Sequence, residues 1–332
     1  MEIRKLFIII LIAAGFTTII AGCGSADVSS GETTKKSTVE LNVAIQPSAA
    51  FVPIYVVKEN GWLEEALGEL GVKVTWTEFE SGPPMNESFA AGQQDIGVIG
   101  DVPAISALVA GYGNTIVGIG AYGEESYALL VSTDSDIDGP SNLKGKTVGL
   151  TVGTTAHNLT DKLLEASGMG IDTDVVIVNL TSGDLQTALE TGQVDAIAVW
   201  EPHITKMVDN ETAKILTDGT GVLRGVNVIF GRTEYLEMNP EVVEIFLEQY
   251  ARGSEELRVN TEEVTAAISE YFSITAEQLQ KVIKKYNYSV AIRDEDIKEL
   301  QRTSDFLVKI NAINEGVDVA NYIDASYYGA AR

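Results

Sequence analysis

The 332-residue chain has one cysteine, Cys23, and only two histidines, His157 and His203. A lone thiol cannot form an internal disulfide or a cysteine-rich zinc site. Two histidines also supply a metal centre or a nucleophilic triad poorly. These shortages argue against an enzyme, and we expect no catalytic residues, no metal and no cofactor.

Basic residues are scarce as well, with 23 Lys and Arg against 48 Asp and Glu, which gives a formal net charge of −25. Nucleic acid and anionic lipid surfaces both require a basic footprint, so we expect neither to bind the folded body. An acidic surface is typical of a well-solvated protein. It does not fix the charge of a ligand, because a pocket can differ locally from the whole. Hydrophobic residues make up 45% of the chain, enough for a packed core.

Beyond the N-terminus the sequence has no apolar stretch of membrane-spanning length. Residues 1–22 combine a positive start with an apolar run and end in Ile20-Ala21-Gly22, directly before Cys23. This ending resembles a bacterial lipobox and predicts a cleaved signal peptide with lipid on Cys23. Residues 23–39 then form a flexible tether. A plain signal peptide or an N-terminal membrane anchor is the alternative. We expect an extracytoplasmic protein anchored to the membrane by lipid.

After the tether, strands and helices alternate in βαβαβ order, and the order occurs twice. The expected strands are residues 41–45, 72–79, 96–99, 146–150, 174–180 and 196–199. Gly92-Gln93-Gln94-Asp95 matches Gly192-Gln193-Val194-Asp195, and Asp101 matches Glu201, each at an offset of 192 − 92 = 100. Chance similarity between α/β units is the alternative. The matched order favours an α/β fold of two Rossmann-like lobes.

The chain is expected to cross between the lobes twice, at residues 115–131 and 226–230. Residues 40–130 would form the first part of lobe 1, residues 131–225 lobe 2, and residues 226–332 a return strand with C-terminal helices that complete lobe 1. Helices are expected at about 240–258, 262–271, 275–286 and 294–312. The Gly-x-Gly-x-x-Gly spacing at 118–123 is interpreted as a hinge strand, because no helix opening follows it. Two crossing segments make a hinge that can close on a ligand.

Several stretches carry a resemblance to a known family. The chain resembles the substrate-binding proteins of aliphatic sulfonate, taurine and nitrate ABC importers, in residues 79–84, 100–103, 142–149, 152–157 and 194–202. The resemblance implies the type II periplasmic-binding-protein fold. It also implies a monomer that captures a small anion, such as an aliphatic sulfonate or taurine, and delivers it to permease subunits with their ATPase. Binders of nitrate and of thiamine or flavin precursors look similar and remain alternatives.

Ligands of open α/β sheets lie at the carboxyl ends of the strands. The candidate ligand-binding residues at these ends are Gln46, Ser48, Ala49, Ser81, Gly82, Asp101, Gly153, Thr154, Thr155, His157, Trp200 and Glu201. The loop at 153–157 is the most informative, because free N–H groups and the dipole at a helix start favour an anion. The alternative is a capped helix with Thr154 or Thr155 as N-cap and His157 on the surface.

The roles of the other candidates stay open at this point. Asp101 and Glu201 could receive an ammonium group, or serve as a helix N-cap and a structural bond near Pro202. Trp200 could form an apolar wall of the pocket or pack in the core. Two further classes of protein are also open. One is the class of pyrimidine-forming enzymes, which share the fold but carry a Cys-rich motif that is absent here. The other is a membrane-tethered sensor domain that works without a transporter.

Overall fold

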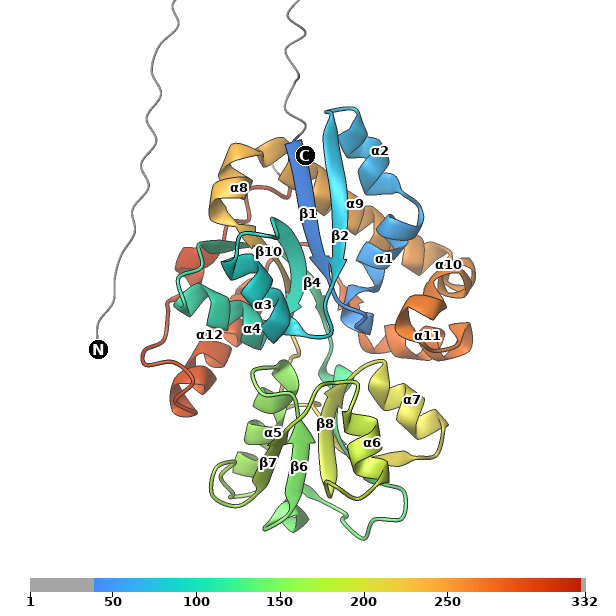
Figure 1. The fold of residues 1–332 in the computed structure, drawn as a ribbon, viewed down its shortest axis with the longest axis vertical. Helices are drawn as coiled ribbons and strands as arrows, with labels where there is room; N and C mark the ends of the chain where they lie inside the picture. The colour runs from blue at the N-terminus through green and yellow to red at the C-terminus, as the bar shows by residue number, and fades with distance from the viewer. Residues whose placement is uncertain (1–38, 330–332) are drawn as a thin grey trace, which may run out of the picture. The chain divides into compact units, whose positions relative to one another are not determined.

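The computed structural model describes residues 39–329. The predicted signal peptide at residues 1–22, the lipid on Cys23 and the tether up to residue 38 lie outside the described residues. Within residues 39–329, no helix is both long enough and apolar enough to cross a membrane. Two separate β-sheets, each covered by helices, build two lobes (Figure 1). The predicted two-lobe α/β fold is confirmed.

The sheet of lobe 1 has six strands in the order β11-β4-β10-β3-β1-β2. Its strands are β1 (Val39–Ile45), β2 (Val72–Glu78), β3 (Ile96–Gly100), β4 (Asn114–Tyr122), β10 (Asn227–Arg232) and β11 (Asn287–Tyr288). The helices that follow its first three strands are α1 (Val52–Glu59), α2 (Trp62–Gly68), α3 (Gly82–Ala90) and α4 (Asp101–Val109). Strands β1, β2 and β3 run parallel, whereas β10 is antiparallel to its neighbours. Apolar side chains on both faces of the sheet are buried under these helices.

The sheet of lobe 2 has five strands in the order β7-β6-β8-β5-β9. Its strands are β5 (Tyr127–Ser132), β6 (Thr147–Leu150), β7 (Val176–Asn179), β8 (Ala196–Trp200) and β9 (Ala213–Asp218). Its helices are α5 (Thr155–Ala166), α6 (Leu185–Glu190) and α7 (His203–Asp209). Three parallel strands are again followed by an antiparallel one. The two sheets therefore repeat one arrangement.

The duplicated Gly-x-x-Asp stretches have the same structural role in both lobes. Gly92 and Gly192 both adopt φ +69°, a left-handed conformation that suits glycine. The Asp95 carboxylate accepts the backbone N–H of Asn42 at 2.8 Å, and the Asp195 carboxylate accepts that of Thr147 at 2.8 Å. In each lobe this bond ties the start of the third parallel strand to the first. The matched Gly-x-x-Asp residues thus help to build the sheet of each lobe.

The first crossing segment lies within the predicted stretch 115–131, whereas the second lies before most of the predicted stretch 226–230. Residues 123–126 lead from β4 to β5, and residues 219–226 lead from β9 to β10. The predicted start of lobe 2 at residue 131 is wrong, because Tyr127 already pairs with Trp200 in the second sheet. Most of the glycine-rich stretch at 118–123 is also not a hinge. It lies inside β4, where the Tyr250 hydroxyl packs against Gly120.

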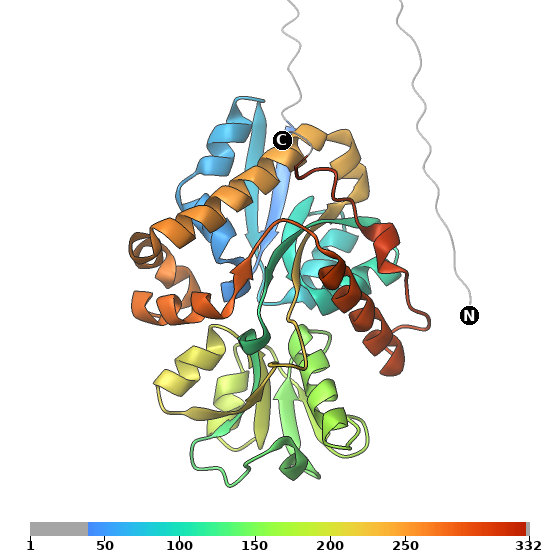
Figure 2. The ribbon, with the colours of Figure 1, turned by 180° about the vertical axis from the view of Figure 1, so that it is seen from behind.

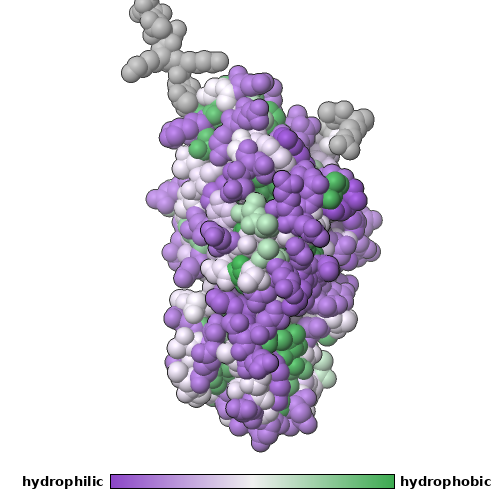
Figure 3. Space-filling view, turned by 90° about the vertical axis from the view of Figure 1, so that its right-hand side faces the viewer, coloured by the Kyte–Doolittle hydropathy of each residue, from purple (hydrophilic) through white to green (hydrophobic). Residues whose placement is uncertain are grey.

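The C-terminal segment completes lobe 1, as Figure 2 shows from behind. Its helices are α8 (Thr233–Met238), α9 (Pro240–Val259), α10 (Thr261–Ile268), α11 (Ala276–Val282) and α12 (Asp294–Lys309). The predicted helix at 275–286 is shorter than expected and continues as a 3-10 turn at Ile283–Lys285. The side face of the molecule is mostly hydrophilic, with apolar residues in small separate patches (Figure 3). That surface agrees with the acidic, well-solvated character of the sequence.

Candidate functional site

A small cavity of about 30 Å³ lies between the two lobes. Lobe 1 lines it with Gln46, Ser48, Phe51, Gly82, Gly100, Pro103 and Asn227, and lobe 2 with Tyr127, Thr154, Thr155 and Trp200. Among the described residues, those lining the cavity include no Lys, Arg, His, Asp or Glu. Any charge on a ligand must therefore be met by neutral groups.

Helix N-termini from both lobes meet at this cavity. Gly82 is the first residue of α3, Gly100 precedes α4, and Thr154 precedes α5. None of these three helices is capped by the side chain at its N-cap position. The first N–H groups of a helix lack intrahelical partners and carry the positive end of the dipole.

At α4 these first N–H groups are already used, because the Asp101 N–H donates to Val226 O at 3.2 Å and the Val102 N–H donates to Asp101 Oδ1 at 2.8 Å. In α3, Pro83 and Pro84 have no N–H, so the donors come mainly from the start of α5. The cavity therefore offers neutral donors with a local potential that favours an anion.

The two threonines at the start of α5 already donate their hydroxyl protons within the protein. Thr154 Oγ1 donates to Thr151 O at 2.7 Å, and Thr155 Oγ1 donates to Asp101 Oδ1 at 2.6 Å. To donate to a ligand, as the sequence predicted, these hydroxyls would have to leave their partners. The backbone N–H groups at the start of α5 are the better donors.

Asp101 joins the lobes from beneath the cavity rather than lining it. Its carboxylate is fully buried and accepts from Thr155 of lobe 2, from Thr303 Oγ1 at 2.6 Å and from the Val102 N–H at 2.8 Å. Burial raises the pKa of Asp101, and the hydrogen bonds from Thr155 and Thr303 offset part of that rise. With these partners in place, the carboxylate is not presented to a ligand ammonium group.

Glu201 makes the corresponding connection from lobe 2. Its carboxylate is fully buried and accepts from Lys285 Nζ of lobe 1 and from Thr205 Oγ1 at 2.9 Å. Its backbone carbonyl accepts the Ala49 N–H at 3.2 Å and the Ser48 hydroxyl at 3.4 Å. Glu201 and Ala49 thus hold the lobes together beside the cavity. Of the two readings left open for Glu201, the structural bond fits this arrangement.

The structure brings six of the predicted site residues to the cavity wall: Gln46, Ser48, Gly82, Thr154, Thr155 and Trp200. Six others do not line it: Ala49, Ser81, Asp101, Gly153, His157 and Glu201. The alternative that places His157 on the surface is wrong. The ring is 8% exposed, its Nδ1 accepts the Gly153 N–H at 3.5 Å, and it meets Phe306 edge-on. Burial lowers the pKa of His157.

Sequence reasoning missed five lining residues: Phe51, Gly100, Pro103, Tyr127 and Asn227. The most informative are Tyr127 and Asn227, whose side chains hydrogen bond at 3.1 Å where the chain enters and leaves lobe 2. Their positions next to the crossing segments could have identified them, because a ligand enclosed between two hinged lobes lies close to the hinge.

Comparisons with known proteins place the chain in a family. The NMT1/THI5-like family profile matches residues 48–264. The chain belongs to the NMT1/THI5-like family. A Bacillus subtilis relative described as an aliphatic sulfonates-binding protein is 30% identical over 322 residues, covering 96% of this chain and 95% of the relative. The taurine-binding periplasmic protein of Escherichia coli is 28% identical over 212 residues, 63% of each chain.

Several solved structures of other proteins share the fold of this chain. The alkanesulfonate-binding protein SsuA from Xanthomonas axonopodis pv. citri, bound to MOPS, superposes with a TM-score of 0.80 at 23% identity, covering 86% of this chain and 98% of that one. The periplasmic aliphatic sulphonate binding protein SsuA from Escherichia coli gives 0.77 at 24% identity, covering 88% and 99%. The desulfurization enzyme DszB gives 0.65 at 16% identity, covering 87% and 97%. The fold alone thus serves both binding proteins and an enzyme.

Proposed function

We propose that this protein is the extracytoplasmic solute-binding component of an ABC importer, and that its solute is an organic sulfonate. The observation that carries the proposal is the cavity between the lobes. Helix N-termini face this cavity, and none of the described residues that line it has a charged side chain. The names of the relatives, aliphatic sulfonate-binding and taurine-binding proteins, support the same solute class.

A sulfonate suits neutral donors for a chemical reason. It is a strong-acid anion that keeps no proton near neutral pH, so each of its oxygens needs only a donor. Backbone N–H groups at helix starts supply donors without supplying acceptors. A phosphate monoester or phosphonate carries a titratable proton and calls for an acceptor as well. The donor set therefore favours a sulfonate over these weaker acids.

The rest of the cavity suits a short organic substituent. Phe51, Pro103 and Trp200 contribute apolar surface beside the polar groups. Ligand pockets typically combine such walls with a few placed donors. We expect the alkyl part of a sulfonate to lie against these side chains and the oxygens to lie near the start of α5.

The protein acts as a binder rather than an enzyme in this proposal. Tyr127 is the only cavity-lining residue, among those described, with a titratable side chain, and burial raises its pKa further above the ordinary value. That leaves little for general acid–base chemistry. Lipid on Cys23 would hold the protein at the membrane beside permease subunits, to which the closed form delivers its solute.

Calorimetric titration of the purified protein with ethanesulfonate, taurine, nitrate and a thiamine precursor tests the solute class. We expect ethanesulfonate to bind at micromolar or lower concentration, and nitrate and the precursor to bind at least a hundredfold more weakly. Tighter binding of nitrate or of the thiamine precursor would refute the sulfonate assignment.

A further inference from the structure

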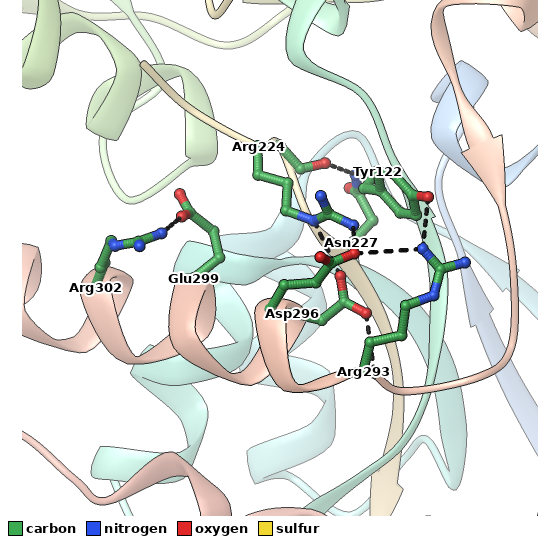
Figure 4. Close-up of polar contacts among 9 residues, drawn as sticks. Tyr122, Arg224, Asn227, Arg293, Asp296, Glu299 and Arg302 are labelled. Carbon is green, nitrogen blue, oxygen red and sulfur yellow. Dashed lines mark hydrogen bonds and ion pairs between the residues drawn. The ribbon is translucent and has the colours of Figure 1, made fainter. Parts of the chain in front are cut away.

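Helix α12 contacts the two crossing segments at one end and helix α5 of lobe 2 at the other. At its N-terminal end the buried Asp296 carboxylate accepts from Arg224 Nε at 3.0 Å, and Arg224 belongs to the second crossing segment. The guanidinium of Arg224 lies 3.9 Å from the ring centre of Tyr122, at the start of the first crossing. Arg293 donates to the Tyr122 hydroxyl at 2.8 Å, as Figure 4 shows. This end of α12 therefore holds both crossing segments.

The C-terminal end of the same helix reaches lobe 2. Lys309 Nζ lies 2.8 Å from Asp161 Oδ2 and 3.0 Å from Glu165 Oε2, both on α5. The Asp161 side chain is only 5% exposed, whereas that of Lys309 is 46% exposed. One turn earlier, Phe306 packs edge-on against His157 at a ring distance of 5.7 Å. The flank of α5 thus rests on the end of α12.

Helix α5 is the lobe 2 helix whose N-terminus faces the cavity. Asp161 and Glu165 are four residues apart and lie on one side of the helix, so a single ammonium group holds that side. Fixing the side of α5 also fixes the direction in which its first N–H groups point. These contacts exist only when the lobes are together, because Lys309 and α5 belong to different lobes.

Two other ion pairs across the lobes have the same polarity. Lys281 pairs with Asp209 at 3.2 Å, and Lys285 pairs with Glu201. In each case the lysine comes from the C-terminal part of lobe 1 and the carboxylate from lobe 2. Closure therefore brings complementary charges together at several points around the cavity, without placing a charge inside it.

We propose that Lys309 is a positioning residue for solute binding. By pairing with Asp161 and Glu165 it aligns the start of α5 with the lobe 1 wall of the cavity in the closed form. This inference rests on the proposed function in one respect, namely that an anion is bound at the start of α5. It adds that part of the affinity is set outside the cavity by charges that never touch the solute.

A double-mutant cycle tests the proposal, with ethanesulfonate affinity as the readout. We expect Lys309→Met and Asp161→Asn each to weaken affinity about fivefold to tenfold, and the double variant to be no weaker than either single variant. Lys309→Arg, which keeps the charge, should bind within about twofold of wild type. Lys298→Met removes an exposed lysine from the same helix and should leave affinity unchanged.

Two further readouts separate positioning from a general loss of stability. The weakening by Lys309→Met should shrink as salt concentration rises, because screening removes the ion pair from the wild type as well. Thermal midpoints of the unliganded Lys309→Met and Lys298→Met variants should agree within a few degrees. Wild-type affinity in Lys309→Met, or losses that simply add in the double variant, would overturn the proposal.

Failure of the proposed function gives a different pattern. If the wild type binds nitrate or another solute of the panel instead, the same cycle is run with that solute, and the expected losses are unchanged. If it binds none of them, small-angle scattering of the unliganded proteins at low salt decides. Lys309→Met should then have a larger radius of gyration than wild type and Lys298→Met, and equal radii would overturn the role of Lys309.

Discussion

The two lobes share a sheet order and differ at the strand ends that face each other. Asp95 and Asp195 make equivalent bonds to the first strand of their own lobe. Asp101 and Glu201, which also match in sequence, both accept from threonine hydroxyls and a backbone N–H. They differ in that only Glu201 is also paired with a lysine. Duplication has kept the residues that build each sheet, and the partners of the strand-end acids differ with their surroundings.

The difference extends to the loops after the first strand of each lobe. In lobe 1 the Ser48 hydroxyl accepts the Ala50 N–H at 3.4 Å and caps the short helical turn that follows. In lobe 2 Thr154 does not cap α5 through its side chain. Free donors are therefore concentrated at the start of α5, on the lobe 2 side of the cavity. From this asymmetry we propose that lobe 2 holds the anionic end of the solute and that lobe 1 closes over it.

The largest expected effect comes from the ion pair that distinguishes Glu201 from Asp101. Lys285→Met leaves a fully buried carboxylate without its cation, which typically destabilises a protein by about 3–5 kcal/mol. We expect a loss near the lower end of that range, about 3 kcal/mol, in urea unfolding, because Thr205 still donates to Glu201. Lys284→Met, at the exposed neighbouring position, should change stability by less than about 0.5 kcal/mol.

The pair is also testable by removing both charges. Lys285→Met combined with Glu201→Gln should recover part of the lost stability, since no buried charge remains uncompensated. A Lys285→Met variant as stable as the Lys284→Met control would show that Glu201 does not depend on Lys285. The contrast drawn between the two strand-end acids would then fail.

A second, smaller effect is the opposite pH dependence of two aspartates. The pKa of Asp101 is raised, mainly by burial. The folded state then holds its proton more tightly than the unfolded chain, so Asp101 lowers stability as pH rises from 3.8 through its folded pKa. Burial alone would raise the pKa of Asp195, but hydrogen bonds from Thr147 outweigh it and lower the pKa overall. Its contribution is present above the ordinary carboxyl pKa and is lost as pH falls through the folded value.

Unfolding free energies between pH 3 and pH 7 check these signs. Relative to wild type, Asp101→Asn should become more stable as pH rises, and Asp195→Asn should become less stable. The change should be smaller for Asp195, because its side chain is 37% exposed and solvent screens its interactions. Parallel pH profiles for the two variants would contradict the assignment of different environments to the two carboxylates.

The repeated βαβαβ order and the matched Gly-x-x-Asp stretches made the fold predictable, because both are local patterns. The loops at 46–50 and 153–157 were predictable as site loops for the same reason, since they follow parallel strands. The partners of Glu201 and Asp161 were not. Lys285 lies 84 residues beyond Glu201, and Lys309 lies 148 residues beyond Asp161. No sequence period links such residues, so only the packing of the C-terminal helices brings them together.

Asn227 was missed for a related reason. The pairing of β10 with β4 shifts register between Asn227 and Val228, and a register shift changes which way a side chain points. The lobe boundary was placed late because the strand after the first crossing is apolar throughout, like the strand before it. Composition alone could not show that Tyr127–Ser132 pairs with the second sheet.

The smallest expected effect concerns Gly153, which adopts φ +80° in the loop before α5. A side chain there is strained whatever the free space, so a bulky Gly153→Val would mix folding and binding effects. Gly153→Ala is the cleaner change, because its Cβ would lie 3.6 Å from Pro83 of the opposite lobe, an ordinary contact.

Gly145, also in lobe 2, is the matched control, because it has φ +73° and open space around it. Both alanine variants should lose about 1 kcal/mol of stability. Only Gly153→Ala should also weaken ethanesulfonate binding, by about threefold to tenfold in calorimetry. The reason is that this change alters the loop that positions the first N–H groups of α5 and places a methyl group against lobe 1. Equal affinities for the two variants would mean that the start of α5 does not hold the solute, and the asymmetry between the lobes would lose its functional meaning.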